Sequence, residues 1–325
     1  MKKRLLLGTL LFTLSLEADN VSFTFYNDFF AGSDGHFTNG ISLSWLETAQ
    51  EDENSYTDML VSLAKTISLP LDSAKHHNGG LNLTQMIVTP VNTQLTSVQK
   101  NDYPYAGYLS LSSFLLEWDN DSFYEYSLEA GIMGKYSGAE FVQKSFHKMI
   151  GNEEPQGWDT QLSTRYTLNL LLQHGMKSWQ GTLGDNLQSD WFNHYGLTLG
   201  NFNTSVFAGS TLRIGQNYVQ NFNVHYPYLK GEANLLDSDT LKNGFGWSTS
   251  VGLETKVLAY SAILDRAASN GYAVHKNIFN ALVHLSGSVY YNHHKLRLFY
   301  EIPTPYIKED TSTNVIGGFE YSYKF

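Results

Sequence analysis

Apolar and polar residues alternate along the chain with a period of two. Val21, Phe23 and Phe25 alternate with Ser22 and Thr24, and the same pattern recurs in about twelve segments. This period is typical of β-strands, and many of the segments have the ~10 residues of a tilted transmembrane strand. They are residues 21–26, 40–45, 80–89, 105–118, 122–134, 159–173, 190–200, 203–215, 245–260, 276–291, 294–302 and 313–325.

The two faces of these segments differ in the way expected of a membrane barrel. One face carries Phe, Tyr, Leu and Val, the other carries mostly small polar residues, and charges are rare inside the segments. A soluble β-sandwich would instead place charged residues on its outward face, whereas a transmembrane barrel has lipid outside and a polar lumen inside. We therefore predict an all-β fold, an antiparallel transmembrane β-barrel of about twelve strands in the outer membrane of a Gram-negative bacterium.

Both ends of the sequence agree with export to that membrane. Lys2, Lys3 and Arg4 precede the apolar stretch 5–16, and Ala18 is a plausible cleavage residue, as in a secretory signal peptide. We predict a signal peptide at 1–18 and a single barrel domain at 19–325. The last segment ends in an aromatic residue, Phe325, and resembles the C-terminal signal that the outer-membrane barrel assembly machinery reads.

Composition excludes several other classes of protein. The net charge is −10, with 21 basic residues, whereas a nucleic-acid-binding protein needs a concentrated basic surface. The chain has no cysteine, so disulfide frameworks, thiolate metal sites and cysteine nucleophiles are excluded. A mean hydropathy of −0.27 alongside 14% aromatic residues is consistent with a barrel, because its apolar residues are confined to one face of each strand.

An even number of strands places both chain ends in the periplasm, which assigns the connections to alternate sides. The expected outward connections are residues 29–37, 90–104, 134–158, 201–203, 261–275 and 303–312. The expected periplasmic ones are residues 47–79, 119–121, 174–189, 216–244 and 292–293, of which 47–79 and 216–244 are unusually long. Helical spacing of apolar residues predicts a short α-helix in the extracellular loop at 138–151, and a second within 60–69.

Polar residues that suit ester hydrolysis gather at the outer end. Asp28 is expected to face the polar side of the first strand, Asn27 its wall or rim, and Thr38 opens the next strand. Gln143 and His147 are four residues apart in the predicted helix, so they share a face, and Glu153 belongs to the same outward connection. A histidine, whose ordinary pKa is about 6.5, can take a proton from water, and oxygen ligands can hold a hard cation that polarises a carbonyl.

Each of these residues also has a simpler interpretation. Asn27–Asp28 and Asn39–Gly40 are common turn residues, and the acidic residue Glu153 can be merely exposed. Outward connections also carry His36 and His275, so position does not single out His147. Three serines on these connections lack a nucleophile motif; they are Ser33, Ser137 and Ser145.

Several of these segments, in order, resemble the outer-membrane lipid A 3-O-deacylase family. Asn27–Asp28 and Asp34, then Phe37-Thr38-Asn39-Gly40, resemble its N-terminal motif, and residues 85–90 its third strand. Asp102-Tyr-Pro-Tyr-Ala-Gly107 resembles an Asp-Arg-Pro-Tyr-Ala-Gly segment, with Tyr103 in place of the arginine. The helix-containing loop matches at Gln143, His147, Ile150-Gly151, Glu153 and Gly157-Trp158.

The resemblance implies a calcium-dependent hydrolase that removes the ester-linked 3′-acyloxyacyl group from lipid A of lipopolysaccharide. It implies that His147 activates water, that Asp28 and Glu153 bind or place Ca²⁺, and that Asn27, Thr38 and Gln143 shape the site or bind the carbonyl. A lysine that follows the third strand in some members has no clear counterpart here, where Leu95 lies near that position and Lys100 follows.

Three alternatives stay open on sequence. Outer-membrane phospholipase A is also a twelve-stranded, calcium-dependent barrel, but its His…Asn-x-Ser-Asn-Gly motif has no serine counterpart beside Asn39–Gly40. A small porin would conduct ions and would need no histidine-bearing helix. A non-enzymatic barrel for adhesion or envelope structure would tolerate loss of His147.

Overall fold

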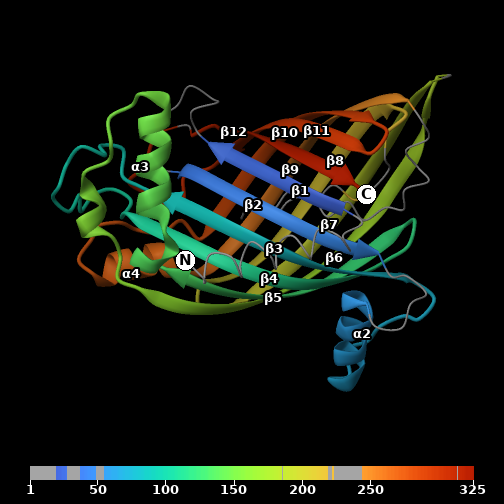
Figure 1. Ribbon diagram of the computed structural model, residues 1–325, viewed down its shortest axis with the longest axis horizontal. Helices are drawn as coiled ribbons and strands as arrows, with labels where there is room; N and C mark the ends of the chain where they lie inside the picture. The colour runs from blue at the N-terminus through green and yellow to red at the C-terminus, as the bar shows by residue number, and fades with distance from the viewer. Residues whose placement is uncertain are drawn as a thin grey trace, which may run out of the picture.

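Twelve antiparallel strands close into a barrel in which each strand pairs with its sequence neighbours and β1 pairs with β12 (Figure 1). The computed structural model describes residues 20–27, 37–48, 55–184, 186–218, 222, 244–312 and 314–325. The strands are β1 (Asn20–Asn27), β2 (Phe37–Thr48), β3 (His76–Val88), β4 (Ala106–Trp118), β5 (Ser122–Met133), β6 (Arg165–Leu183), β7 (Leu187–Gly200), β8 (Asn203–Gln216), β9 (Phe245–Ser261), β10 (Phe279–Tyr291), β11 (His294–Pro303) and β12 (Ile316–Lys324).

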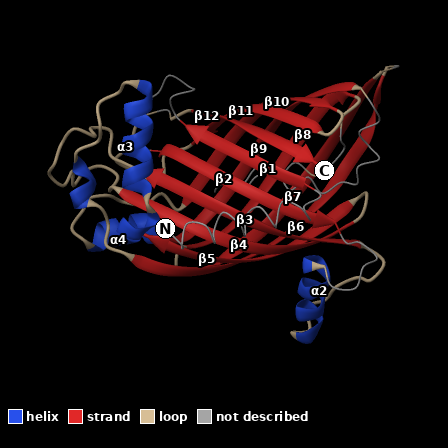
Figure 2. Cartoon of the chain, viewed as in Figure 1, coloured by secondary structure: helices blue, strands red, loops and turns tan. Residues whose placement is uncertain are grey.

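The helices lie at the two ends of the barrel (Figure 2). Helix α2 (Tyr56–Thr66) lies at the end that carries the C-terminus, and α3 (Ala139–Ile150) and α4 (Ala262–Ser269) lie at the other. In the usual orientation of an even-stranded barrel the first is the periplasmic end and the second the outer end. None of the helices in the described part of the chain is long and apolar enough to cross a membrane.

The predicted barrel is confirmed, with corrections to its boundaries. The predicted strand 159–173 is wrong at both ends, because residues 157–160 form a 3-10 turn and β6 runs from Arg165 to Leu183. The predicted periplasmic connection 174–189 is therefore a short hairpin between β6 and β7. The helix expected within 60–69 is α2, which begins four residues earlier, and α4 was not predicted. The predicted signal peptide, residues 1–18, lies outside the described residues.

The lumen differs from the expectation that charges are rare inside the strands. Arg213 is 1% exposed and its Nη2 lies 2.8 Å from the Asp190 carboxylate, while Lys295 and Arg297 both pair with Glu320 at 3.4 and 3.1 Å. Burying an ion costs several kcal/mol unless it is paired. These charges are tolerated because the inward positions of adjacent strands bring opposite charges together.

Apolar clusters fill the barrel near both of its ends. At the outer end, Ile263 and Leu264 of α4 pack with inward residues such as Phe299, and Tyr108 stacks on Phe202 with ring centroids 3.6 Å apart. At the periplasmic end, a second cluster is formed by Leu46, Phe114, Leu116, Trp118, Phe123 and Phe222. The interior is therefore a packed core that fixes the wall on which α3 lies.

Candidate functional site

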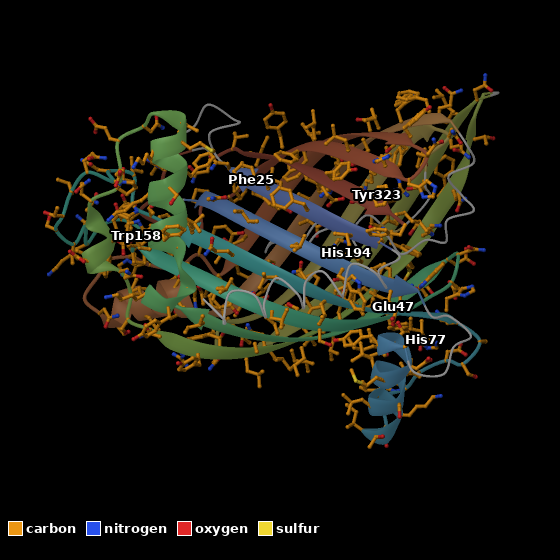
Figure 3. All side chains as sticks on the ribbon, viewed as in Figure 1. Phe25, Glu47, His77, Trp158, His194 and Tyr323 are labelled. Carbon is orange, nitrogen blue, oxygen red and sulfur yellow. The ribbon has the colours of Figure 1, made fainter. Side chains whose placement is uncertain are left out.

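Helix α3 lies on the outside of the barrel wall at its outer end, and it crosses several strands. At the start of the helix, Ala139 packs on Gly107 of β4, where an added Cβ would lie 2.2 Å from the Ala139 Cβ. Near its end, the Phe146 ring lies 5.9 Å from that of Phe25 on β1. Between these two contacts α3 lies against the outer ends of β3 and β4 (Figure 1). Figure 3 labels Phe25 and Trp158, which lie on either side of the helix.

A small buried cluster holds the helix in this position. Ile87 of β3, Ala139, Tyr105 and Trp158 form it, and the rings of Tyr105 and Trp158 are 5.1 Å apart. The Tyr105 hydroxyl donates to the Thr93 carbonyl at 3.0 Å, and burial raises the pKa of Tyr105, so the hydroxyl stays a neutral donor. The cluster therefore joins α3, its following loop and loop 89–105 to the wall.

Gln143 presents an unpaired amide donor beneath the helix. Its side chain is 1% exposed, and its Oε1 accepts a hydrogen bond from Trp158 Nε1 at 2.8 Å. This bond fixes the orientation of the amide, since the indole nitrogen only donates. The Nε2 group is buried and has no hydrogen-bond partner among the described residues. A buried, unsatisfied donor is costly, and a carbonyl oxygen of a bound molecule would satisfy it.

His147 lies one helical turn beyond Gln143 and is oriented by the backbone. Its Nδ1 is 2.7 Å from the Glu153 carbonyl oxygen. Because a carbonyl only accepts, this contact requires the proton on Nδ1 and leaves Nε2 of the neutral ring free to accept a proton. Gly151 makes the contact possible: it ends α3 with φ of 75°, which turns the chain back towards the ring.

Two asparagines lie at outward-facing positions of the wall beside the helix. Asn27 shares parity with Phe25 on β1, and Asn39 shares parity with Ile41 on β2, yet each is only 3% exposed. The β1–β2 register ends at Tyr26 opposite Gly40, and its continuation places Asn27 opposite Asn39. The Asn39 Oδ1 is buried without a hydrogen-bond partner among the described residues. Polar groups thus replace lipid-facing apolar residues where α3 covers the wall.

Of the predicted set, Gln143 and His147 lie one turn apart on α3. Asn27 ends β1 two residues beyond Phe25, whose ring lies 5.9 Å from that of Phe146. Thr38 lies in β2 at a register shift between Phe37 and Asn39, and its side chain is outside the described residues, as is Asp28 entirely. The Glu153 side chain is exposed, and the contact that the structure describes for this residue is through its carbonyl oxygen.

The other histidine and serine candidates on the outward connections are less well placed to act beside Gln143. His275 is 73% exposed and hydrogen-bonds Glu309 through Nδ1 at 2.6 Å, in loops far along the chain from α3. Partial burial acts to raise the pKa of Glu309, but hydrogen bonds from His275 lower it below its ordinary value. Ser137 is buried beside Ala139 and Ser145 is exposed on α3, while His36 and Ser33 lie outside the described residues.

Sequence reasoning assigned no role to Asn39 or Trp158. A signal for Asn39 was present, because an asparagine at a lipid-facing position of a barrel strand is unusual. Trp158 had no such signal, since its role depends on the loop folding back so that its indole reaches Gln143.

The donor set at the wall fits a hard cation in part. Among the residues with described positions, no group of three or more histidines and carboxylates is arranged to hold a metal. The unpartnered Asn39 oxygen is, however, a ligand type that Ca²⁺ accepts, and Asp28 directly follows Asn27 in the sequence.

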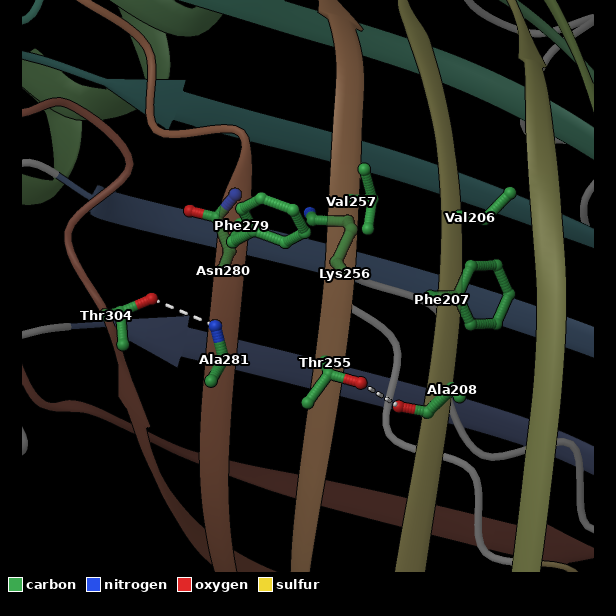
Figure 4. Close-up of a pocket in the computed structure, with 10 residues that line it drawn as sticks. All are labelled: Val206, Phe207, Ala208, Thr255, Lys256, Val257, Phe279, Asn280, Ala281 and Thr304. Carbon is green, nitrogen blue, oxygen red and sulfur yellow. Dashed lines mark hydrogen bonds between the residues drawn. The ribbon is translucent and has the colours of Figure 1, made fainter.

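Two other cavities lie away from α3. A groove of about 480 Å³ crosses the lipid-facing side of β8, β9 and β10 and is bordered by Val206, Val257 and Phe279 (Figure 4). A polar cavity of about 520 Å³ lies between loop 89–105 and residues 307–312, and Lys100 lines it. Neither contains a residue of the predicted site.

Comparisons with known proteins agree with this architecture. A family model described as outer membrane protein LpxR matches residues 5–325. The solved structure of LpxR from Salmonella typhimurium superposes with a TM-score of 0.74 at 15% identity, covering 94% of this chain and 100% of that chain. The β domain of the Bordetella autotransporter BrkA covers 95% of this chain and 100% of its own at 10% identity, with a TM-score of 0.48. A search of curated proteins by sequence finds no match.

Proposed function

The chain belongs to the LpxR family of outer-membrane lipid A 3-O-deacylases, and from this premise we propose that it hydrolyses the ester-linked 3′-acyloxyacyl group of lipid A with His147 as general base. The supporting observation is that the His147 imidazole and the unpaired Gln143 amide lie one turn apart on α3, against the outer face of the barrel. The proposed substrate is a lipid of the outer leaflet, because α3 lies at the outer end of the barrel.

The proposed reaction uses both side chains. His147 Nε2 takes a proton from water while the water oxygen forms a bond to the ester carbonyl carbon. The Gln143 Nε2 group donates to the carbonyl oxygen as negative charge develops on it. The C–O bond to the sugar then breaks, and the His147 imidazolium returns the proton to the departing alkoxide, which gives a free hydroxyl and a carboxylic acid.

Calcium is part of the proposal through the resemblance to the family. Bound Ca²⁺ would stabilise the negative charge that develops on the carbonyl oxygen. Asp28 and Glu153 are the proposed ligands or placing groups, and the unpartnered Asn39 oxygen is an additional candidate. Asn27 and Thr38 are proposed to shape the site from the two strands beside it.

Two features of the structure also favour this proposal over the alternatives. Neither Ser137 nor Ser145 is placed as the nucleophile of a phospholipase A-like enzyme, since Ser137 is buried and Ser145 is exposed away from any described histidine contact. The packed clusters near both ends of the barrel weigh against a porin.

The test compares lipids as well as metal conditions. The folded protein is incubated with hexa-acylated lipid A or with a diacyl glycerophospholipid, each with Ca²⁺ or with a chelator. We expect acyl release from lipid A with Ca²⁺, and little with the chelator. Acyl release from the glycerophospholipid alone would instead favour a phospholipase A-like activity. Full activity in the presence of the chelator would contradict the proposed metal dependence.

A further inference from the structure

Helix α2 carries an exposed apolar stripe outside the barrel. Met59, Leu63 and Ile67 are 55%, 55% and 63% exposed. They follow one another at intervals of four residues, so they lie along one side of the helix. A stripe of this kind on a water-facing helix would be unfavourable, because each large apolar side chain left in water forgoes the favourable free energy of burial.

The start of α2 is fastened to the outer face of the barrel near its periplasmic end. The Thr57 backbone N–H donates to Glu47 Oε2 at 2.6 Å, and the Thr57 hydroxyl accepts from the Gly79 N–H at 2.8 Å. Glu47 and Gly79 face each other in the β2–β3 register. Figure 1 shows the rest of the helix extending away from the wall at the end that carries the C-terminus.

A second contact determines which way the stripe faces. The Tyr56 ring packs edge-on against Trp45 with centroids 5.4 Å apart, and its hydroxyl lies 2.7 Å from Ser113 Oγ. Trp45 is two residues closer to the membrane centre along β2 than Glu47, which corresponds to roughly 7 Å. The side of α2 that carries Tyr56 therefore faces the membrane centre.

Tyr56 and the exposed stripe lie on the same side of the helix. Met59, Leu63 and Ile67 are three, seven and eleven residues beyond Tyr56, the spacing of a single apolar face. Lys65 follows Leu63 by two residues and is therefore rotated about 200° around the helix. The apolar side thus points towards the bilayer and the charged side towards the periplasm.

We propose that α2 is an interfacial helix whose Met59–Leu63–Ile67 stripe is buried in the phospholipid of the periplasmic leaflet of the outer membrane. The occupant follows from continuity with the barrel wall: Trp45 belongs to its lipid-facing side, and Tyr56, which lies on the same side of the helix as the stripe, packs against it. Amphipathic helices with this division lie in the plane of the interface, with their apolar side about 5–10 Å deep. This inference does not depend on the proposed activity.

The absence of cysteine from the chain makes the test direct. Leu63→Cys and Lys65→Cys are each labelled with an environment-sensitive fluorophore, and each full-length protein is placed in phospholipid nanodiscs that hold one copy. Leu111→Cys, on the lipid-facing wall of β4, reports the fully lipid-exposed signal. Heat-dependent mobility on gels checks that every variant forms the barrel.

Spin-labelled phospholipids should quench the label at position 63 at least about two-fold more than the label at 65, with a blue-shifted emission. Equal, weak quenching at both positions would overturn the proposal. A parallel sample in vesicles that hold several copies tests for self-association. If position 63 is shielded there but not in the single-copy nanodiscs, the stripe binds a second copy of the chain, which would also overturn the proposal.

Discussion

At the scale of single residues, the proposed site consists mainly of two side chains whose hydrogen-bonding directions are fixed by their neighbours. Trp158 holds the Gln143 amide by its oxygen, and the Glu153 carbonyl holds the His147 ring by Nδ1. Each neighbour thereby leaves the chemically useful nitrogen, the Gln143 Nε2 donor and the His147 Nε2 acceptor, without a described partner. Preorganised groups of this kind stabilise a transition state without reorganising during the reaction.

The Gln143 amide gives the first prediction. If it donates to the developing oxyanion, Gln143→Ala should lower kcat for lipid A hydrolysis by about 10²–10³-fold. Trp158→Phe keeps the aromatic ring but removes the orienting N–H, so a smaller loss of about ten-fold is expected. Lys144→Ala is the matched control, because Lys144 pairs only with the exposed Glu140 among the described residues; undiminished turnover by Gln143→Ala would contradict the assignment.

Residue-scale prediction from sequence succeeded where helical spacing was sufficient. Gln143 and His147 share a face, as their separation of four residues required. Asn39 precedes Gly40 as in a common hairpin turn, so the sequence predicts a turn residue, whereas the structure buries its side chain at an outward-facing position of β2. Glu153 was chosen for its carboxylate, whereas the described contact uses its carbonyl oxygen.

At the scale of elements, the position of α3 depends on close approach to β4. A Cβ on Gly107 would meet both the Ala139 Cβ and the Ser137 Oγ at 2.2 Å. Any larger residue must therefore push the start of the helix away from the wall, and the helix carries both proposed reacting side chains.

This contact gives the second prediction. Gly107→Val should leave the barrel folded but lower the activity by about 10²-fold, since a displacement near 1 Å has such an effect on a positioned group. Gly287→Val is the matched control, because an added Cβ at Gly287 meets nothing within 4 Å. Equal activity of the two variants, measured at matched amounts of folded protein, would show that the seating of α3 does not matter.

Strands were more predictable than helices in this chain. Each strand is recognisable from the alternation of apolar and polar residues, because one face contacts lipid and the other faces the lumen. Helix α4 has eight residues and is stabilised mainly by burial of Ile263, Leu264 and Ala267 in the outer cluster. Short helices depend on such tertiary packing, so a local pattern is a weak guide to them.

At the scale of the whole molecule, the lumen of the barrel is filled by the protein's own side chains. Arg213, Asp190 and Tyr218 form a buried hydrogen-bonded group in the lumen, and Arg297 pairs with Glu320. With the apolar clusters near either end, these groups occupy the space that a porin leaves for water. The charges that are rare in the sequence segments are concentrated here, where Arg213, Lys295 and Arg297 lie beside carboxylates.

The filled lumen gives the third prediction. The purified protein should show no steady conductance in planar bilayers, because the interior is packed. Stable channel openings by the wild-type protein would contradict the packed interior.

The buried ion pair in the lumen gives a fourth prediction. Asp190→Ala should lower the free energy of unfolding of the barrel by about 3–5 kcal/mol, since it leaves Arg213 buried without its carboxylate. Urea unfolding in detergent micelles measures this change, and an unchanged free energy of unfolding would contradict the importance of the pair.

The central claim is that His147, on a helix covering the outer wall of this barrel, activates water to cleave an ester of lipid A. Mass spectrometry of hexa-acylated lipid A, after incubation with Ca²⁺ and either the wild-type protein or His147→Ala, tests it most directly. We predict that the wild type removes the 3′-linked acyloxyacyl group and that His147→Ala is slower by about 10²–10⁴-fold. Intact lipid A with the folded wild type, or the same product at the same rate from His147→Ala, would contradict the account.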